Sequence, residues 1–414
     1  MQDIYQNAAL NIAATAAING SIGLFYNRDP KALEPLKVDI AWPFLTHNET
    51  RAYVFSPSLS VSSHVDEAPL NRRAWVMQER HLSRRIVHFT RDVVYWECCK
   101  TFANEIYPAG LPRSGGTGEL VRHTRNLKRS LQVSYSDHLN KEQREGLYSA
   151  WQEFVGAYTK CQLTYEEDKI VALTGIAQRV SRVLQDDLVG GLWRSHFIKE
   201  LCWVTDNRGD PKPSYVESKA WIAPSWSWQS LSSPIVMDDR RHSHDLAQLV
   251  EVEVSAKPSG ALIDGHITLR CRLIPAILLP MKPLLGRDMC KIYFPDDTYG
   301  MPLFDSIGKL RYMLVESDRA HVVDPSGGTT EIYLLALVSS GADLQVLDNL
   351  RVWTNFDISI TGISITSSTY HRNSFERVGV FHACHPGLLG YGDSFFKKLV
   401  EKYKNTQDQI IRLV

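Results

Sequence analysis

Apolar residues recur at the three- to four-residue spacing of an amphipathic helix in four stretches of the chain. The clearest stretch covers residues 140–160. A second follows Thr164, which together with Glu167 forms the sequence of a capping box. A third stretch covers residues 192–204, and a shorter one covers residues 73–82. The spacing therefore predicts four helices, all in the N-terminal part of the chain.

Alternation of apolar and polar residues marks the predicted strands. Residues 86–90 and 93–98 lie on either side of Arg91-Asp92, which predicts a β-hairpin. Beyond residue 230 the period changes to two, with turn residues between several of the stretches. The strands predicted there cover residues 247–254, 267–273, 312–315, 332–338 and 377–381, and a last helix is predicted at residues 394–403.

These elements predict an α+β fold in two regions. Residues 1–230 form a helix-rich N-terminal half with one β-hairpin, and this half packs on a mainly antiparallel β C-terminal half, residues 231–414. Residues 26–68 carry four spaced prolines and are predicted to form loops. A hydrophobic fraction of 44% and a charged fraction of 22% are those of a folded globular chain.

The chain carries no excess of charge, because lysine plus arginine number 46 and aspartate plus glutamate also number 46. A neutral chain lacks the overall basic charge typical of nucleic-acid binding, and no apolar stretch is long enough to cross a bilayer. We therefore expect neither a nucleic-acid partner nor a membrane span. Seven cysteines without a CxxC pair, and no signal-peptide pattern, predict reduced thiols and a cytoplasmic location.

Three side chains around the predicted hairpin are candidates for general acid–base catalysis: Glu79, His81 and Glu97. A histidine titrates near neutrality, and a glutamate buried in an apolar hairpin has the raised pKa that a catalytic acid requires. The alternatives are structural. A single histidine is more often simply hydrogen-bonded, and Glu97 can pair with Arg85 or another arginine of this arginine-rich stretch.

The candidate substrate-binding residues are Arg73, Trp75, Trp96, Trp226 and Trp228. An arginine binds carboxylate or phosphate groups, and stacked indoles can form the floor of a pocket for an apolar ligand. The alternatives are an ion pair between the arginine and the neighbouring glutamate, and a tryptophan core that joins the helical and β layers.

The segment at residues 224–228 reads Pro-Ser-Trp-Ser-Trp, and in an extended conformation its serines would face one side and its indoles the other. The sequence holds no P-loop, no GxGxxG and no GxSxG motif. His242, His244 and Asp245 form its one dense cluster of metal-binding residue types, in a polar stretch that matches no zinc site. We therefore expect no cofactor and no metal.

Several blocks of the sequence carry a family resemblance when they are taken in order. Residues 4–16 read IYQNAALNIAATA, and residues 69–79 read PLNRRAWVMQE. Later blocks lie at residues 190–193, 224–228 and 375–379. Together these blocks resemble those of the heterokaryon-incompatibility (HET) domain proteins of filamentous fungi.

The resemblance implies a role in fungal non-self recognition, in which HET proteins trigger incompatibility cell death through protein partners. The elements that usually open a HET domain would precede Met1, so the resemblance also implies that the N-terminal part of the domain is missing. The acid–base and tryptophan candidates leave an alternative open. It is a cofactor-independent cyclase, dehydratase or isomerase that acts on a hydrophobic polyketide or terpenoid intermediate.

Overall fold

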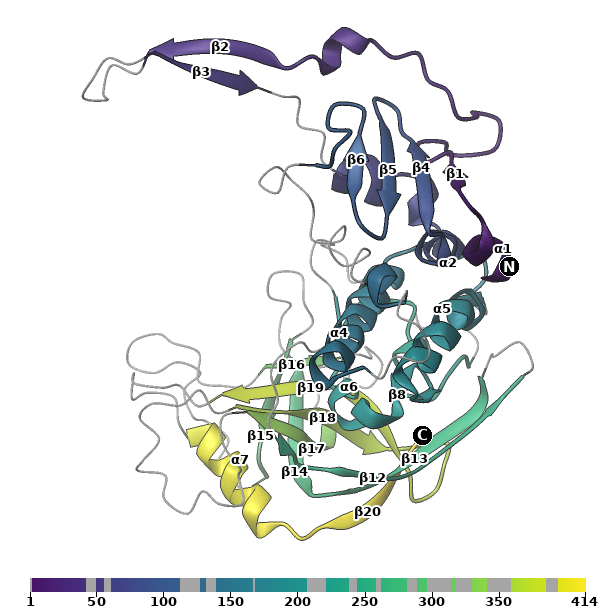
Figure 1. The fold of residues 1–414 in the computed structure, drawn as a ribbon. Coiled ribbons are helices and arrows are strands. Elements are labelled where there is room, and N and C mark those ends of the chain that lie inside the picture. Colours follow the sequence, from purple (N-terminus) through teal and green to yellow (C-terminus); the bar gives the residue numbers. More distant parts are fainter. Residues whose placement is uncertain are drawn as a thin grey trace. The chain divides into compact units, whose positions relative to one another are not determined.

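The chain divides into two compact units, whose elements are drawn in Figure 1. The first unit comprises Met1–Thr164 and Ala172–Leu184, and the second comprises Tyr165–Val171 and Gln185–Val414. This division differs from the predicted boundary at residue 230, because the tryptophan-rich stretch before that residue belongs to the second unit. The computed structural model describes residues 2–41, 50–55, 61–111, 127–131, 139–166, 168–206, 221–237, 244–257, 262–280, 289–295, 314–317, 330–340, 359–384 and 394–414.

A four-stranded sheet lies in the first unit, in the order β1-β4-β5-β6 (Figure 1). Its strands are β1 (Asn11–Ala13), β4 (Arg85–Phe89), β5 (Val94–Cys98) and β6 (Phe102–Asn104). β1 pairs with β4 in parallel, whereas β4, β5 and β6 pair antiparallel. The predicted hairpin is confirmed in β4 and β5, whose burial alternates from residue to residue.

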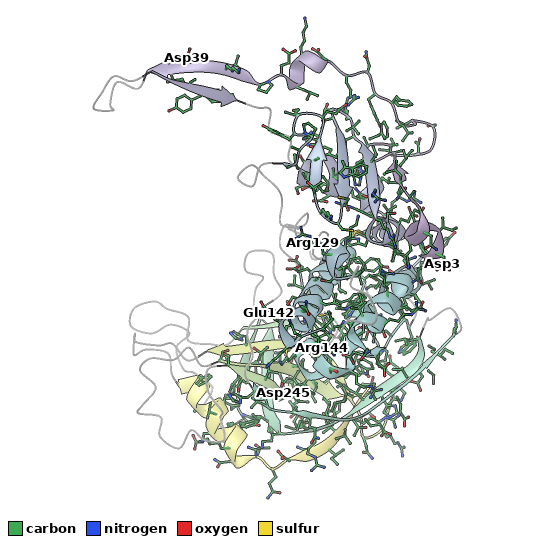
Figure 2. All side chains as sticks on the ribbon, in the orientation of Figure 1. Asp3, Asp39, Arg129, Glu142, Arg144 and Asp245 are labelled. Atoms are coloured by element: carbon green, nitrogen blue, oxygen red, sulfur yellow. The ribbon has the colours of Figure 1, made fainter. Side chains whose placement is uncertain are left out.

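A second hairpin pairs β2 (Leu36–Ala41) with β3 (Thr50–Phe55), and Asp39 in Figure 2 lies on it. The sequence placed these residues in loops, and that prediction was wrong. The alternation Leu-Lys-Val-Asp-Ile in β2 was the strand signal, although prolines flank it. Short helical turns complete this part of the chain: η1 (Pro30–Leu33), η2 (Ser62–Asp66) and η3 (Leu70–Arg72).

The helices of the first unit are α1 (Gln2–Asn7), α2 (Ala74–Leu82), α4 (Lys141–Tyr158) and most of α5 (Asp168–Leu184). The first four residues of α5 belong to the second unit. The prediction of α2, α4 and α5 is confirmed. Asn140 and Gln143 form a capping box at the start of α4. The capping box predicted for α5 needs Glu167, which lies outside the described residues.

The helix predicted at residues 192–204 was wrong. The structure has a two-residue strand, β8 (Leu192–Trp193), a turn η4 (Arg194–His196) and a single helical turn, α6 (Phe197–Glu200). The Glu200 carboxylate accepts a hydrogen bond from the Trp193 amide at 2.7 Å, so this backbone remains extended. β8 pairs with β7 (Leu188–Val189), and β9 (Val204–Thr205) pairs with β10 (Ile235–Val236).

A large sheet, ten-stranded over the described residues, forms the second unit. Its strands are β11 (His244–Asp245), β12 (Gln248–Ala256), β13 (Leu262–Cys271), β14 (Leu273–Pro280), β15 (Met289–Tyr293), β16 (Leu314–Ser317), β17 (Thr330–Ser340), β18 (Ser359–Ser367), β19 (Phe375–Cys384) and β20 (Gln409–Leu413). Their pairings are antiparallel except for β19 with β20. The pairing closes into a ring, since β18 joins β17 on one side and β19 on the other.

The core of this ring is aliphatic and aromatic. It combines side chains of β14, β17, β18 and β19 with those of the amphipathic helix α7 (Ser394–Asn405). Gly362 in β18 permits the close strand crossing, because a Cβ there would overlap the Leu335 carbonyl of β17. The predicted β-rich C-terminal region and its closing helix agree with these elements.

The mixed α and β content of the prediction is confirmed, with several separate sheets. The finer arrangement, a helical half against a β half, holds only in part. The first unit contains a four-stranded sheet and a second hairpin in addition to its helices.

Candidate functional site: a buried ion cluster

Glu97 of β5 is the centre of a buried cluster of charged side chains in the first unit. Strand alternation directs it inward, and it is only 2% exposed. Its Oε2 accepts hydrogen bonds from Arg80 Nε at 2.7 Å and His88 Nε2 at 3.1 Å. Its Oε1 accepts a hydrogen bond from Lys128 Nζ. Two cations and one imidazole therefore surround a single carboxylate.

Arg80 extends the cluster from Glu97 to a second acid. Its NH1 donates to Asp66 Oδ1 at 2.8 Å, and both side chains are almost fully buried. Asp66 Oδ2 and Arg80 NH2 have no hydrogen-bond partner among the described residues. With Asp66 and Glu97 ionised and Arg80 and Lys128 charged, the cluster is electrically neutral. A balanced set of this kind limits the cost of burying each charge.

The surroundings hold Glu97 in its ionised form. Burial acts to raise its pKa, but the charges of Arg80 and Lys128 outweigh burial and hold the pKa of Glu97 well below its ordinary value. Burial also raises the pKa of Asp66, an effect that Arg80 partly offsets. Burial lowers the pKa of Lys128, which Glu97 partly offsets. The raised pKa expected of Glu97 as a catalytic acid is therefore not found.

His88 links the cluster to the edge strand β1. Burial lowers the pKa of His88, although its hydrogen bond to Glu97 partly offsets the shift. Because ionised Glu97 can only accept, His88 Nε2 must carry the proton. In the neutral ring Nδ1 is then an acceptor, and it lies 3.0 Å from the hydroxyl of Thr15. Thr15 follows β1, so the cluster fixes this segment against β4.

His81 is a predicted catalytic residue whose ring is almost fully buried beside the ion cluster. Its Nδ1 lies 2.7 Å from the Met77 carbonyl, and its ring packs edge-on against Phe154 at 4.8 Å between centroids. Burial, followed by the charges of Arg80 and Lys128, lowers the pKa of His81 to about 3. The ring is thus neutral at physiological pH, with Nδ1 as the donor.

Glu79 and Arg73 lie near one another at the surface of α2. Burial raises the pKa of Glu79, and a hydrogen bond from the Tyr5 hydroxyl and the charge of Arg73 partly offset this effect. Burial and Glu79 together raise the pKa of Tyr5 to about 12. The Arg73 side chain is exposed, and Trp75 and Trp96 are half-buried. The hydrogen bond from Tyr5 gives Glu79 a structural role that was not predicted, since it joins α2 to α1.

Gln78, in the same block at residues 69–79, joins α2 to α5. Its Oε1 accepts a hydrogen bond from the Gly175 amide at 3.0 Å. A Cβ at residue 175 would lie 2.7 Å from that same oxygen, so the close approach requires glycine. Residues 73–79 therefore hold together elements from distant parts of the sequence.

Trp226 and Trp228 belong to the second unit and have no exposed surface. Trp228 Nε1 donates to the Gly191 carbonyl at 2.9 Å, and the Trp226 ring packs against Phe197. A Cβ at Gly190 would overlap the Trp226 ring. Residues 224–228 form a turn and the helical turn η5 (Trp228–Ser230) instead of an extended strand, because the Ser227 hydroxyl caps η5. Both predicted serine and indole faces are buried.

Arg377 of β19 contacts the segment that carries Trp203. Its guanidinium lies 3.4 Å from the centroid of the Trp203 ring and donates to the carbonyls of Leu201 and Trp203. The Trp203 indole in turn donates to the Trp226 carbonyl at 3.0 Å. This buried network lies in the second unit and joins β19 to the tryptophan-rich segment.

The structure thus separates the predicted site residues. Glu97 and His81 lie in or beside the ion cluster, Glu79 and Arg73 lie together on α2, and the tryptophan pair lies in the other unit. Sequence reasoning missed Thr15, Asp66, Arg80 and Lys128. Only Arg80 carried a signal, since it directly follows the Gln78-Glu79 motif on a predicted helix.

The fold and the cluster describe a mixed α/β protein whose first unit is organised around buried ion pairs. Residues 1–79 of this unit match the family model described as Heterokaryon incompatibility protein (HET). The match confirms the predicted resemblance to the HET family, with the domain represented in part, over 79 of the 414 residues. The resemblance of the later blocks stays a prediction. No curated protein and no solved structure matches the chain significantly.

Two further findings concern only the part of the chain that the structure describes. None of its helices is long and apolar enough to cross a membrane. No group of three or more histidine, cysteine, aspartate or glutamate side chains is arranged to hold a metal ion. His242, of the cluster noted in the sequence, lies outside the described residues.

Proposed function

We propose that this protein acts in heterokaryon incompatibility, the non-self recognition of filamentous fungi, as a component that triggers cell death. The observation that carries the proposal is the HET family match over residues 1–79. The location of the matched segment supports it. Thr15, Asp66 and Gln78 of this segment bond to residues beyond it, so the HET-like sequence is built into the first unit instead of forming a detached arm.

The enzymatic alternative has less support. A tryptophan-lined pocket requires indole surface that a ligand can reach, whereas Trp226 and Trp228 have none. A catalytic acid requires a raised pKa, whereas the pKa of Glu97 lies well below its ordinary value. We therefore propose one function, incompatibility signalling through a protein partner.

The test is inducible expression of the whole chain in a filamentous fungus. Induction is expected to stop hyphal growth and to admit a vital dye that intact cells exclude. Undiminished growth and viability, at an expression level confirmed by immunoblot, would contradict the proposal.

Two neighbouring arginines provide a matched pair of variants for this test. Arg72 and Arg73 are both exposed, but only Arg73 belongs to the motif block R-A-W-x-x-Q-E, residues 73–79, and its charge acts on Glu79. Arg73→Gln is expected to weaken the growth defect more than Arg72→Gln does. Equal effects of the two variants would argue against a role for the motif block in signalling.

A further inference from the structure

A cleft borders the ion cluster in the first unit, on the side of Lys128. It lies at the C-terminal end of α2, and its enclosed part is small, about 10 Å³, which is room for about one water-sized group. Its walls come from α1, α2, the residues after β5, the helical turn at residues 127–130, and α5. This enclosed space is far smaller than a whole small-molecule site, so the cleft can take only one small group of a ligand, and the rest of the ligand would remain outside it.

The charged residues that line the cleft are all cationic. They are Arg84, Lys128 and Arg179, and no aspartate or glutamate is among the described lining residues. Lys128 is 2% exposed, and its ammonium group is fixed by Glu97. Arg179 donates from Nε, at 3.1 Å, and from NH2, at 2.5 Å, to the Leu131 carbonyl. Two of the three cations are therefore held in place before any ligand arrives.

A further cation lies close by. Arg129, labelled in Figure 2, donates from Nε to the Cys99 carbonyl at 2.9 Å, and Cys99 itself lines the cleft. Arg84 also lines the cleft, and the Cys99 thiol donates weakly to the Arg84 carbonyl. The positive charges thus come from separate segments of the chain and meet at one cleft.

The negative groups nearby are already satisfied. The C-terminal carbonyls of α2 would repel an anion, but His81 occupies the Met77 carbonyl. The Glu79 carbonyl accepts both the amide and the hydroxyl of Ser83, at 3.2 and 2.7 Å. The negative charge of Glu97 is balanced in part by its buried ion pair with Arg80. Because Lys128 is paired with Glu97, the net positive charge at the cleft comes from Arg84 and Arg179.

We propose that this cleft binds the phosphoryl group of a small ligand, with Arg84 as the exposed guanidinium that closes on it. Guanidinium groups donate two parallel hydrogen bonds to phosphate oxygens, and Lys128 and Arg179 supply charge from fixed positions. Phosphate binding at this cleft does not require that the protein act in incompatibility, so the two can be tested separately.

The test is isothermal titration calorimetry of the whole chain at constant ionic strength, with inorganic phosphate and with phenyl phosphate as probes. Saturable binding of either probe is expected. Tighter binding of phenyl phosphate identifies a phosphomonoester as the natural class of ligand, and equal binding identifies free phosphate. Absence of saturable binding at tens of millimolar, for both probes, would overturn the proposal.

Arg84 and Arg85 are adjacent exposed arginines, and only Arg84 lines the cleft. Arg84→Gln is expected to weaken phosphate binding by about tenfold, the loss of one charge-assisted contact, whereas Arg85→Gln changes it by less than about twofold. Equal losses in both variants would reveal a general charge effect and overturn the assignment.

A second readout follows the His81 ring by NMR. Because an anion in the cleft favours the imidazolium form, bound phosphate is expected to raise the pKa of His81 from about 3. The shift must disappear in Arg84→Gln and persist in Arg85→Gln. A His81 titration that ignores phosphate would contradict binding at this cleft.

Discussion

The two units each bury an arginine, and they stabilise it in different ways. Arg80 in the first unit is 3% exposed and pairs with two carboxylates, Asp66 and Glu97. Arg377 in the second unit is fully buried, lies over an indole ring and donates to two backbone carbonyls. The partners of Arg80 are carboxylates, which titrate, whereas the partners of Arg377 are an indole ring and backbone carbonyls, which do not. The stability of the first unit should therefore depend on individual ionisable residues and on pH.

The largest expected effect is that of Glu97→Gln. The substitution leaves Arg80 and Lys128 buried without their shared counter-ion, which should cost about 3–5 kcal/mol of the free energy of unfolding of the first unit. Hydrogen exchange followed by mass spectrometry resolves the two units, so protection should fall in β4 and β5 and remain in β17 and β18. Glu142→Gln, an exposed control in the first turn of α4 (Figure 2), should change protection by less than about 0.5 kcal/mol.

The next largest effect is expected from Arg377→Met in the second unit. This variant keeps the volume but leaves the carbonyls of Leu201 and Trp203 without their donor, at a cost of about 2–4 kcal/mol. Exchange should then accelerate in β18 and β19 while the first-unit sheet keeps its protection. Loss confined to the first unit would refute the division of the chain into these two cores.

The dependence on pH separates the two cores further. The folded pKa of His81, about 3, lies below its unfolded value of about 6.5. The unfolded chain therefore binds the extra proton between these values, and the first unit loses stability as pH falls through this range. The loss attributable to His81 is about 1.4 kcal/mol per pH unit, measured as urea unfolding of the first unit at pH 6 and pH 5. In His81→Gln this part of the slope should vanish, while an unchanged slope would contradict a buried neutral ring.

The smallest effect is expected from a substitution at the start of α4, away from both buried arginines. Asn140→Ala removes the hydrogen bond of the capping box in which Asn140 Oδ1 accepts from the Gln143 amide, and should cost about 1 kcal/mol in the first unit. Because neither an asparagine side chain nor a backbone amide titrates in this range, the cost should be the same at pH 6 and at pH 5. A strongly pH-dependent cost would mean that the cap is coupled to the ion cluster.

Local periodicity predicted much of the fold. The apolar stripe of residues 147–158 specified α4, and alternation specified the hairpin β4–β5. The same reasoning failed at residues 192–204, because a tertiary hydrogen bond from the Trp193 amide to Glu200 competes with the helix that the apolar spacing allows. It also missed β2, where neighbouring prolines outweighed a clear alternation.

The candidate site could be predicted only where the sequence placed its residues close together. Glu97 and its pairing with an arginine were foreseen as the structural alternative, on the hairpin itself. Asp66 comes from a segment predicted to form loops, and Lys128 from a segment for which no element was predicted, so no local pattern connected them to Glu97. Arg80 sits among other arginines, and spacing alone does not distinguish the buried one. A raised pKa was expected of Glu97 only in its catalytic role, and the charges of Arg80 and Lys128 lower this pKa instead.

The central claim is that Glu97 is an ionised carboxylate that organises the first unit. It is tested most directly by ¹³C NMR of the Glu97 side-chain carboxyl during an acid titration of the whole chain. We predict that this signal remains that of a carboxylate as pH falls below about 4.3, the pKa of glutamate in an unstructured peptide, until the sheet β4–β5 itself unfolds. Protonation of Glu97 at or above that pH, in the folded protein, would contradict the account.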